Sequence, residues 1–391
     1  MAWKLVKPDR VALSGCAAGI LSLTLGWLTL KPNRLATGTS LSLWDSFGWG
    51  IAAIIFTLWL LCLVLSIIGT RRRHVIALGL SLNLIILLTF VWAGFSATRL
   101  LENASSLSRV SLGAGIWVTS LGAYISIFPC RKKLGGSLLW QSLVSWSGLA
   151  AITILFGTGW LNNVSLVVEF RQQETQFMQQ LANHVILFTS SAIVGTLIGI
   201  PLGILARRSQ LAEKPVFFIT NILQTVPSLA LFGLLIAPLS ALSFAFPILR
   251  QWGISGIGTA PAIIALIIYS LLPVTRNTYV GLKQLDPAII DAGYGMGMSR
   301  SQIFRRIEIP LSAPLVLEGV RTASVQAVGN TAVAALIGAG GLGWFIFQGI
   351  SQAANDVVIL GALPIMGLAL IVDVVMRWLV KLATPKGQVT E

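Results

Sequence analysis

The side chains that most often carry chemistry in proteins are scarce in this sequence. Its 391 residues include three cysteines and two histidines. Cys16, Cys62 and Cys130 lie within or at the ends of apolar segments, and their spacing suits neither a disulfide framework nor a metal site. His74 and His184 alone provide too few ligands for a metal or redox centre. We therefore expect no catalytic residue, no metal and no resident cofactor in this chain.

A glycine-rich segment, Gly338–Gly343, has the sequence GAGGLG and invites comparison with phosphate-binding loops. It lacks the lysine that such loops use, and the sequence G-x-x-x-x-G-K-[ST] occurs nowhere in the chain. We therefore expect no nucleotide-binding phosphate loop in this sequence.

The most informative spacing lies in one polar segment, 276–311. Asp286 is typical of a helix N-cap, and Pro287 then takes the first helical position, where its missing N–H costs nothing. The helix should end around Gly295–Gly297, because glycine tolerates a left-handed turn. An ordinary amphipathic loop resting on lipid headgroups is the alternative interpretation.

A second short helix should follow in the same segment. Ser299 and Gln302 have the spacing of a capping box. Pro310 should end this helix. Its apolar face would be formed by Ile303, Phe304 and Ile307, and its exposed face by Arg305 and Arg306.

The elements that hold this segment are predicted to be membrane-spanning helices. The chain is 55% hydrophobic and 10% charged, whereas soluble domains carry about a quarter charged residues. Its apolar runs are continuous and about 20 residues long, which suits helices rather than barrel strands. We expect an all-α integral membrane protein with about ten spans, at 11–30, 48–68, 75–95, 110–129, 138–158, 184–206, 215–237, 258–275, 312–336 and 357–380.

Basic residues lie mostly in the loops on one side of these spans. Placing the N-terminus inside satisfies the positive-inside rule and puts both termini in the cytoplasm. The net charge of +14 is spread over short loops, so it indicates anionic membrane lipid rather than nucleic acid. The cytoplasmic clusters are then Lys4/Lys7/Arg10, Arg71–Arg73, Arg131–Lys133, Arg207/Arg208/Lys214, the segment 276–306 and Arg377/Lys381/Lys386.

The sequence divides into two membrane regions. Residues 1–160 form an extension of about five spans that contains little with a chemical interpretation. A polar, glutamine-rich segment, 161–183, should connect the two regions on the periplasmic side. Residues 184–391 contain the remaining spans and the segment 276–311 as a cytoplasmic loop.

The segment 276–311 resembles the EAA loop of binding-protein-dependent ABC importer permeases. An acidic residue and two small residues (Asp291, Ala292, Gly293), a glycine six positions on (Gly297), and then Ile307 and Pro310 fill that pattern. Asp replaces the usual Glu, Gly the second Ala and Ile309 the usual Leu. The resemblance implies a type I permease core formed by the C-terminal five spans, in a bacterial inner membrane.

The same resemblance implies the partners. The first helix of the loop would dock on a dimer of ATP-binding subunits, which bind ATP and magnesium. A second permease, either a copy or a different chain, would complete the pathway, and a periplasmic binding protein would deliver the solute. The chain itself would be a non-catalytic subunit that couples ATP hydrolysis to alternating access.

Three further stretches, within a resemblance that covers about 180–380, resemble the osmoprotectant branch, whose permeases serve glycine betaine, choline or carnitine. They are Gln224–Leu231, the segment 272–282 and Ile337–Gly343. The long N-terminal extension is similar to that of one subgroup. A permease for amino acids, which shares parts of these stretches, an ion-coupled secondary transporter and a non-transporting scaffold or sensor remain as alternatives.

Two groups of residues are candidates for the pathway or its gate. Gln224, Thr225, Pro227 and Ser228 lie together in a span, where they would line the pathway or form a buried hydrogen bond between helices. Gly338, Gly340, Gly341 and Gly343 would form a sharp bend near the outer mouth or a tight helix crossing.

Charges and glycines elsewhere in the C-terminal region have structural interpretations. Glu318 with Arg321, and Asp373 with Arg377, have the spacing of pairs on one helix face. Each charge would cost about 2.5–3.5 kcal/mol alone at mid-membrane, so we expect them to be paired. Gly195, Gly199 and Gly203 should form one packing face.

Overall fold

The computed structural model describes residues 9–68, 71–251 and 253–385. Lys4, Lys7 and Lys386, which were assigned to cytoplasmic clusters, lie outside these residues. The chain forms two compact units, the N-terminal unit Met1–Gln172 and the C-terminal unit Gln173–Glu391. The predicted divisions, at 160 and 183, fall on either side of this boundary. Each unit is described by itself.

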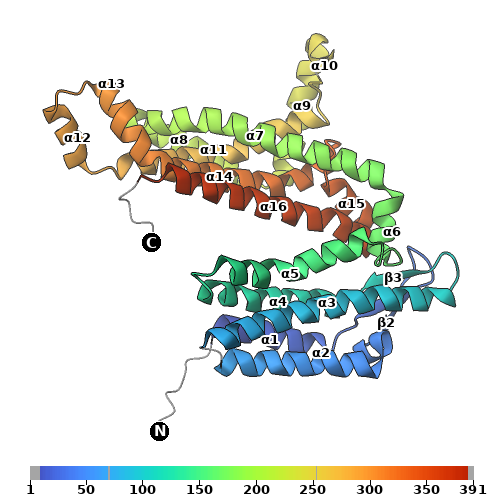
Figure 1. Cartoon of the computed structure of the whole chain (residues 1–391). Coiled ribbons are helices and arrows are strands. Elements are labelled where there is room, and N and C mark those ends of the chain that lie inside the picture. Colours follow the sequence, from blue (N-terminus) through green and yellow to red (C-terminus); the bar gives the residue numbers. More distant parts are fainter. Residues whose placement is uncertain (1–8, 69–70, 252, 386–391) are drawn as a thin grey trace, which may run out of the picture. The chain divides into compact units, whose positions relative to one another are not determined.

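The N-terminal unit is a helical bundle with a small sheet at one end (Figure 1). Its elements are α1 (Arg10–Ser22), β1 (Leu28–Lys31), β2 (Thr39–Leu41), α2 (Leu43–Ile68), α3 (Arg72–Glu102), β3 (Arg109–Leu112), α4 (Ala114–Lys133), α5 (Leu138–Gly157) and α6 (Ser165–Gln172).

The sheet corrects two predicted spans and the expectation of a purely helical chain. The run 11–30 is helical only to Ser22, and its end becomes the central strand of an antiparallel sheet with the order β2-β1-β3. The run 110–129 likewise begins in β3. Hydropathy alone does not separate a buried strand from a helix. Here the buried Trp27 ends the helical run, because its indole packs 5.4 Å from the ring of Phe47 and donates to the Ser22 carbonyl.

A close backbone contact joins α1 and α4 in this unit. A Cβ added to Gly15 would lie 2.2 Å from Ser126 Oγ and 2.4 Å from the Gly122 carbonyl oxygen. The two backbones therefore meet directly, as small residues permit in membrane helix pairs. The cysteines Cys16, Cys62 and Cys130 are free thiols buried in the surrounding core.

The C-terminal unit contains the remaining elements. They are α7 (Glu174–Arg208), α8 (Gln210–Thr225), α9 (Ser228–Ala245), α10 (Ile248–Gln251), α11 (Thr259–Lys283), α12 (Pro287–Gly295), α13 (Arg300–Ile303), a π-helical turn η1 (Phe304–Glu308), α14 (Ile309–Ala334), a 3-10 turn η2 (Ala335–Ile337), α15 (Gly343–Ser351) and α16 (Asn355–Ala383).

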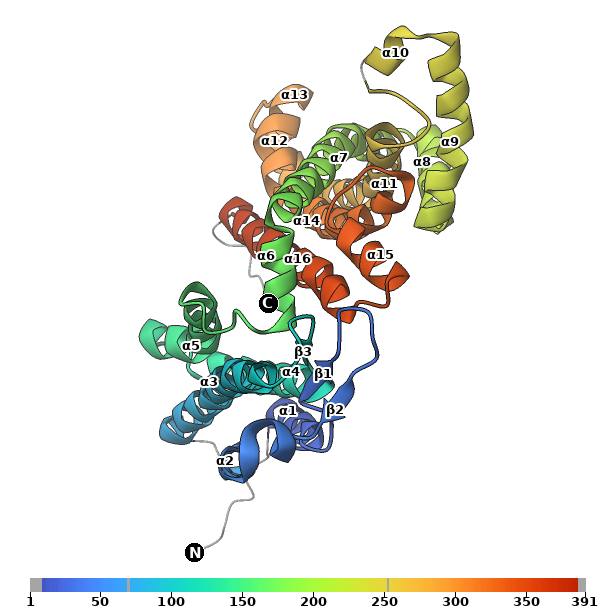
Figure 2. The ribbon, with the colours of Figure 1, turned by 90° about the vertical axis from the view of Figure 1, so that its right-hand side faces the viewer.

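Four long helices, α7, α11, α14 and α16, form the centre of this unit, and α9 and α10 extend away from them (Figure 2). The predicted glycine face is confirmed, since added Cβ atoms at Gly195, Gly199 and Gly203 would meet α11. The predicted span 215–237 is in fact two helices, α8 and α9, which break at Pro227. The sixth predicted span begins at Glu174, ten residues before its predicted start.

Seven helices in the described residues are long and apolar enough to cross a membrane: α2, α3, α5, α7, α9, α11 and α16. About ten were predicted. The three spans that fall short are 11–30, 110–129 and 312–336, and the first fails because α1 has 13 residues, which is short of a full crossing. Polar residues dilute α4 and α14, although both are long enough. The chain is a multi-pass, largely helical membrane protein.

Candidate functional site

The first helix of the loop 276–311 has the predicted local structure. Asp286 Oδ1 accepts a hydrogen bond from the Ala288 amide at 2.9 Å, and Pro287 is the first residue of α12. The helix ends at Gly295, and Gly297 follows with φ of +77°. The glycine turn is thus confirmed, because φ near this value favours glycine.

The second helix begins as predicted but does not end at Pro310. The capping box is present: Gln302 Oε1 accepts from the Ser299 amide at 2.7 Å, and Ser299 Oγ accepts in return. The chain then stays helical from Arg300 to Ala334. Pro310 has no N–H to donate. The preceding turn is a wider π turn, in which the Ile309 amide donates to the Phe304 carbonyl, and this turn accommodates the proline within the helix.

Gly293 packs inside the loop. An added Cβ there would lie 2.9 Å from Ile307 Cδ1 and 3.4 Å from Ile303 Cγ1, so α12 lies directly against the second helix. Ile303 is buried, whereas Arg305 and Arg306 are exposed, as predicted for the two faces. The small residue at position 293 therefore serves the internal packing of the loop.

Polar and aromatic contacts join the loop region to α7, α8 and α11. The Arg208 guanidinium lies 4.3 Å from the ring centre of Phe304. Lys283 Nζ donates to Tyr279 Oη at 2.8 Å, and Tyr279 donates to Glu213 Oε1 at 2.5 Å. The contacts of Arg208 with Phe304 and of Tyr279 with Glu213 were not predicted, because these partners lie far apart in the sequence.

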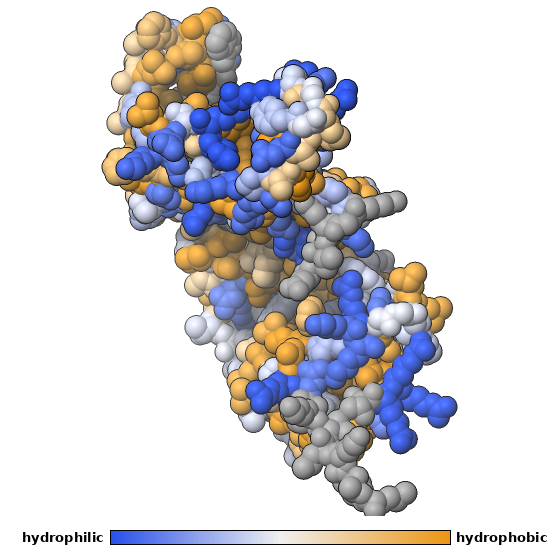
Figure 3. Space-filling view, turned by 90° about the vertical axis from the view of Figure 1, so that its left-hand side faces the viewer, coloured by the Kyte–Doolittle hydropathy of each residue, from blue (hydrophilic) through white to orange (hydrophobic). Residues whose placement is uncertain are grey.

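Apolar side chains are exposed on the outer surface of α12 and its turn, where no other described residues cover them. Ile289, Tyr294 and Met296 are 44%, 51% and 74% exposed, and Asp291 and Ala292 are exposed beside them. Figure 3 looks onto this end of the unit, where hydrophilic residues surround lighter and apolar ones. An exposed apolar group with a polar rim is typical of a protein-binding surface.

The break between α8 and α9 is held by a hydroxyl group. Val226 precedes Pro227 and has extended backbone, as residues before proline commonly do, so its carbonyl lies outside the helical ladder, and Tyr269 Oη of α11 donates to it. Beside the break, Gln224 Nε2 lies 3.5 Å from Gln326 Oε1 of α14. Such a break at membrane depth is stable only where its backbone groups are satisfied.

Near this break, α14 and α8 each carry polar residues on one face, and Ser228 begins α9. On α14, Thr322, Gln326 and Asn330 are spaced by four residues, and none is fully buried. An added Cβ at the neighbouring Gly329 would meet nothing within 4 Å. On α8 and α9 the matching residues are Asn221, Gln224, Thr225 and Ser228. The α14 residues were missed by sequence reasoning, although their four-residue spacing is a visible signal.

The glycine segment forms a sharp bend that α7 holds in place. Gly338, Gly340 and Gly341 have φ of +78°, +76° and +89°. Gln180 Oε1 accepts from the Gly341 amide at 2.6 Å. An added Cβ at Gly343 would lie 1.8 Å from the Ala332 carbonyl oxygen, so this position also requires glycine.

His184 is the second link between α7 and the bend. Its Nδ1 accepts from the Leu342 amide at 3.2 Å, so Nε2 carries the proton and donates to the Val328 carbonyl at 3.1 Å. The side chain is fully buried and neutral in this arrangement. Sequence reasoning assigned His184 no role, because its partners lie more than 140 residues away.

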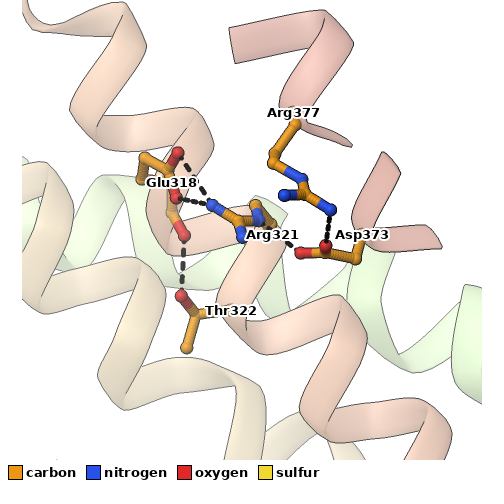
Figure 4. Close-up of polar contacts among 5 residues, drawn as sticks. All are labelled: Glu318, Arg321, Thr322, Asp373 and Arg377. Carbon is orange, nitrogen blue, oxygen red and sulfur yellow. Dashed lines mark hydrogen bonds and ion pairs between the residues drawn. The ribbon is translucent and has the colours of Figure 1, made fainter. Parts of the chain in front are cut away.

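The four predicted structural charges form one network between α14 and α16 (Figure 4). Arg321 pairs with Glu318 at 2.9 Å, and Arg377 pairs with Asp373, as predicted for each helix. Arg321 Nε also binds Asp373 Oδ1 at 2.7 Å, which joins the two helices. Each carboxylate thus has an arginine partner, which offsets the cost of charge in the membrane.

Comparison with known families agrees with this arrangement. Residues 195–384 match the model of the binding-protein-dependent transport system inner membrane component. Among curated proteins, the carnitine transport permease protein OpuCB of Listeria monocytogenes is 37% identical over 57% of this chain and 95% of its own length. The chain therefore belongs to the family of binding-protein-dependent transport system inner membrane components. It is a membrane permease of an ABC transporter.

Other relatives of the permease have similar coverage. The osmoprotectant import permease protein OsmW of Salmonella typhimurium is 40% identical over 52% of this chain and 90% of its own length. The choline transport system permease protein OpuBB of Bacillus subtilis is 34% identical over 56% and 95%. Residues 9–167 match a separate model, the N-terminal domain of the ABC transporter permease YehY. The N-terminal extension of this permease is therefore a recognised domain.

Proposed function

We propose that this permease imports small osmoprotectant solutes, such as glycine betaine, carnitine or choline, in a complex driven by ATP. The relatives named for carnitine, choline and osmoprotectant transport support this substrate class. A permease for amino acids is the alternative within the same family.

The exposed surface of α12 supports the proposal that this permease couples solute transport to ATP hydrolysis in a partner subunit. Ile289, Tyr294 and Met296 lack a covering element within the described chain. They would fill a groove on an ATP-binding subunit, where ATP and magnesium are bound. Asp291 and Ala292 lie on the same exposed surface, while Gly293, Gly297, Ile307 and Pro310 shape the loop that presents it.

The pathway would lie along the polar faces of α8 and α14, beside Ser228 at the start of α9. Their amides and hydroxyls carry no charge, so they offer a cation or zwitterion contacts weak enough for it to leave again. One chain supplies half of such a pathway, and a second permease would supply the rest. A periplasmic binding protein would deliver the solute to the side of the glycine bend.

The charge network argues against an ion-coupled secondary transporter. Such a carrier needs intramembrane carboxylates that bind and release a coupling ion. The carboxylates of Glu318 and Asp373 are both paired with Arg321. The distribution of basic residues supports an orientation in a bacterial inner membrane with both termini and α12 in the cytoplasm.

The coupling surface can be tested with side chains that point outward. Replacing Tyr294 by Ala together with Met296 by Glu should reduce ATP-dependent solute uptake at least about tenfold, because buried interface anchors commonly contribute 2 kcal/mol or more. Gly297 is unsuitable for this test, since any side chain is strained at its φ of +77°.

Leu211→Ala is the matched control, because Leu211 is 90% exposed near the start of α8 and lies outside the loop. Uptake and solute-stimulated ATP hydrolysis are measured in vesicles that contain the whole complex. Normal uptake in the double variant would remove the basis for docking at α12. Uptake of an amino acid instead of quaternary ammonium solutes would overturn only the substrate class.

A further inference from the structure

A cavity opens at the end of the N-terminal unit where α3 begins and α4 ends. Its volume is about 430 Å³. Val75 and Leu134 are buried at its floor, with exposed fractions of 4% and 2%. The remaining lining residues are exposed at its rim and are Arg72, Lys133, Gly135 and Gly136.

The rim of the cavity is strongly basic. Arg71–Arg73 at the start of α3 and Arg131–Lys133 at the end of α4 bring six basic residues to this end of the unit. Among residues 9–68 and 71–172, one ion pair involves these six: Lys133 Nζ lies 2.8 Å from Asp9 Oδ2. Asp9 also accepts from the Val11 and Ala12 amides. Most of the positive charge therefore has no acidic partner in the described unit.

The cavity lies where the apolar surface of the unit gives way to charge. Leu138 and Leu139 follow its glycine rim directly and are 84% and 64% exposed at the start of α5. Ile67 and Ile68 are also exposed at the end of α2. Figure 3 shows hydrophilic residues gathered on this end of the N-terminal unit, in the lower part of the view. This is the depth at which lipid headgroups meet a membrane protein.

We propose that this cavity binds the phosphate of an anionic phospholipid such as phosphatidylglycerol. Arg72 and Lys133 contact the phosphate as charge-assisted donors. Gly135 and Gly136 leave open space for the headgroup, since an added Cβ at Gly136 would meet nothing within 4 Å. Val75 and Leu134 contact the glycerol backbone, and the acyl chains lie along Leu138 and Leu139. A soluble phosphate ester would make the charged contacts without these apolar ones.

The test uses the delipidated full-length permease in a neutral detergent. Three probes are titrated, namely dioctanoyl-phosphatidylglycerol, dioctanoyl-phosphatidylcholine and glycerol 3-phosphate, with bound probe counted by native mass spectrometry. We expect tight binding of the first probe alone. The double variant Arg72→Gln/Lys133→Gln should weaken it about a hundredfold, because each charge-assisted hydrogen bond to the phosphate contributes about a tenfold factor.

The control is Arg73→Gln/Lys132→Gln, which removes the same charge from the same end but does not line the cavity. We expect it to weaken binding less than about threefold. The variant Arg72→Lys/Lys133→Arg should retain binding. Labelling of the buried cysteines checks that each variant is folded.

Three results would overturn the proposal. Equal weakening by the two double variants would indicate diffuse surface charge. Equal binding of phosphatidylcholine would show that the negative charge of the lipid is not recognised. Binding of glycerol 3-phosphate as tight as that of the lipid would assign the cavity to a soluble anion.

Discussion

The two units of this permease are stabilised in different ways. The N-terminal unit has one continuous apolar core, in which glycines let α1 and α4 touch backbone to backbone. The C-terminal unit has smaller apolar clusters, and polar contacts join its helices at the bend, at the helix break and at the charge network. Polar contacts such as the Lys133–Asp9 pair add to the apolar core of the first unit. The second unit has a polar face on α14 and the exposed α12 surface, which we propose docks on an ATP-binding subunit.

The largest expected effect comes from disrupting the close contact between α1 and α4 in the N-terminal unit. Gly15→Val should destabilise this unit by about 3 kcal/mol or more, because the added methyls would force α1 and α4 apart. The three cysteines of the chain all lie in this unit and are buried. Thermal unfolding followed with a thiol-reactive dye therefore reports on this unit alone.

Gly50→Val is the control for that prediction, since an added Cβ at Gly50 would meet nothing within 4 Å. It should shift the thiol transition far less. An unchanged transition in Gly15→Val would show that close helix contact is not what stabilises the N-terminal unit.

A smaller effect is expected from breaking the polar contacts of the C-terminal unit. His184→Leu leaves the Leu342 amide and the Val328 carbonyl without a partner, which should cost about 2–3 kcal/mol. Proteolysis of the C-terminal unit should accelerate, while the thiol transition of the N-terminal unit stays in place. His184→Gln can restore one of the hydrogen bonds and should be milder. A shift of the thiol transition by His184→Leu would contradict the separation into two units.

The smallest expected effect comes from removing the carboxylate of Asp9. It tests how much a charge contributes to the stability of the N-terminal unit, whose core is mainly apolar. Burial raises the pKa of Asp9, but the hydrogen bond from Lys133 and the amides of Ala12 and Val11 outweigh it, and the pKa lies below its ordinary 3.8. The contribution of Asp9 is therefore complete above pH 3.8 and is lost as the pH falls through the lower folded-state value.

Asp9→Ala should lower the stability of the unit by about 1 kcal/mol at neutral pH, as the loss of a helix cap commonly does. The difference from the parent should shrink at acid pH in the same thiol assay. Asp9→Asn keeps a cap without the charge and should lie between the two. A difference that grows on acidification would contradict the assigned role of the carboxylate.

The helix caps of the loop 276–311 could be predicted from the sequence, because they depend on neighbouring residues. Contacts between residues far apart in the sequence could not be predicted in this way. Asp286, Pro287, Ser299 and Gln302 act within one helical turn, so their caps can be read from neighbouring residues. The Gln180–Gly341 hydrogen bond joins residues 161 positions apart, and no local pattern indicates it.

The errors have physical reasons too. The run 11–30 was expected to be one helix, but Trp27 and the sheet turn its end into a strand. Pro310 was expected to stop a helix, but a π turn accommodates it. In both cases tertiary contacts or a wider turn overrode a local preference. The run 215–237 was expected to be one span, and the structure divides it at Pro227 into α8 and α9.

The uninterrupted helical path through Pro310 has a mechanical consequence. From Arg300 to Ala334 it spans on the order of 50 Å at 1.5 Å per residue. A rigid rod of that length, rotated by about 10° around its midpoint, displaces each tip by roughly 4 Å. We therefore expect that a small rotation of the loop end, next to α12, moves Gln326 and the glycine bend together, because both belong to the other half of the same helical rod or follow it directly.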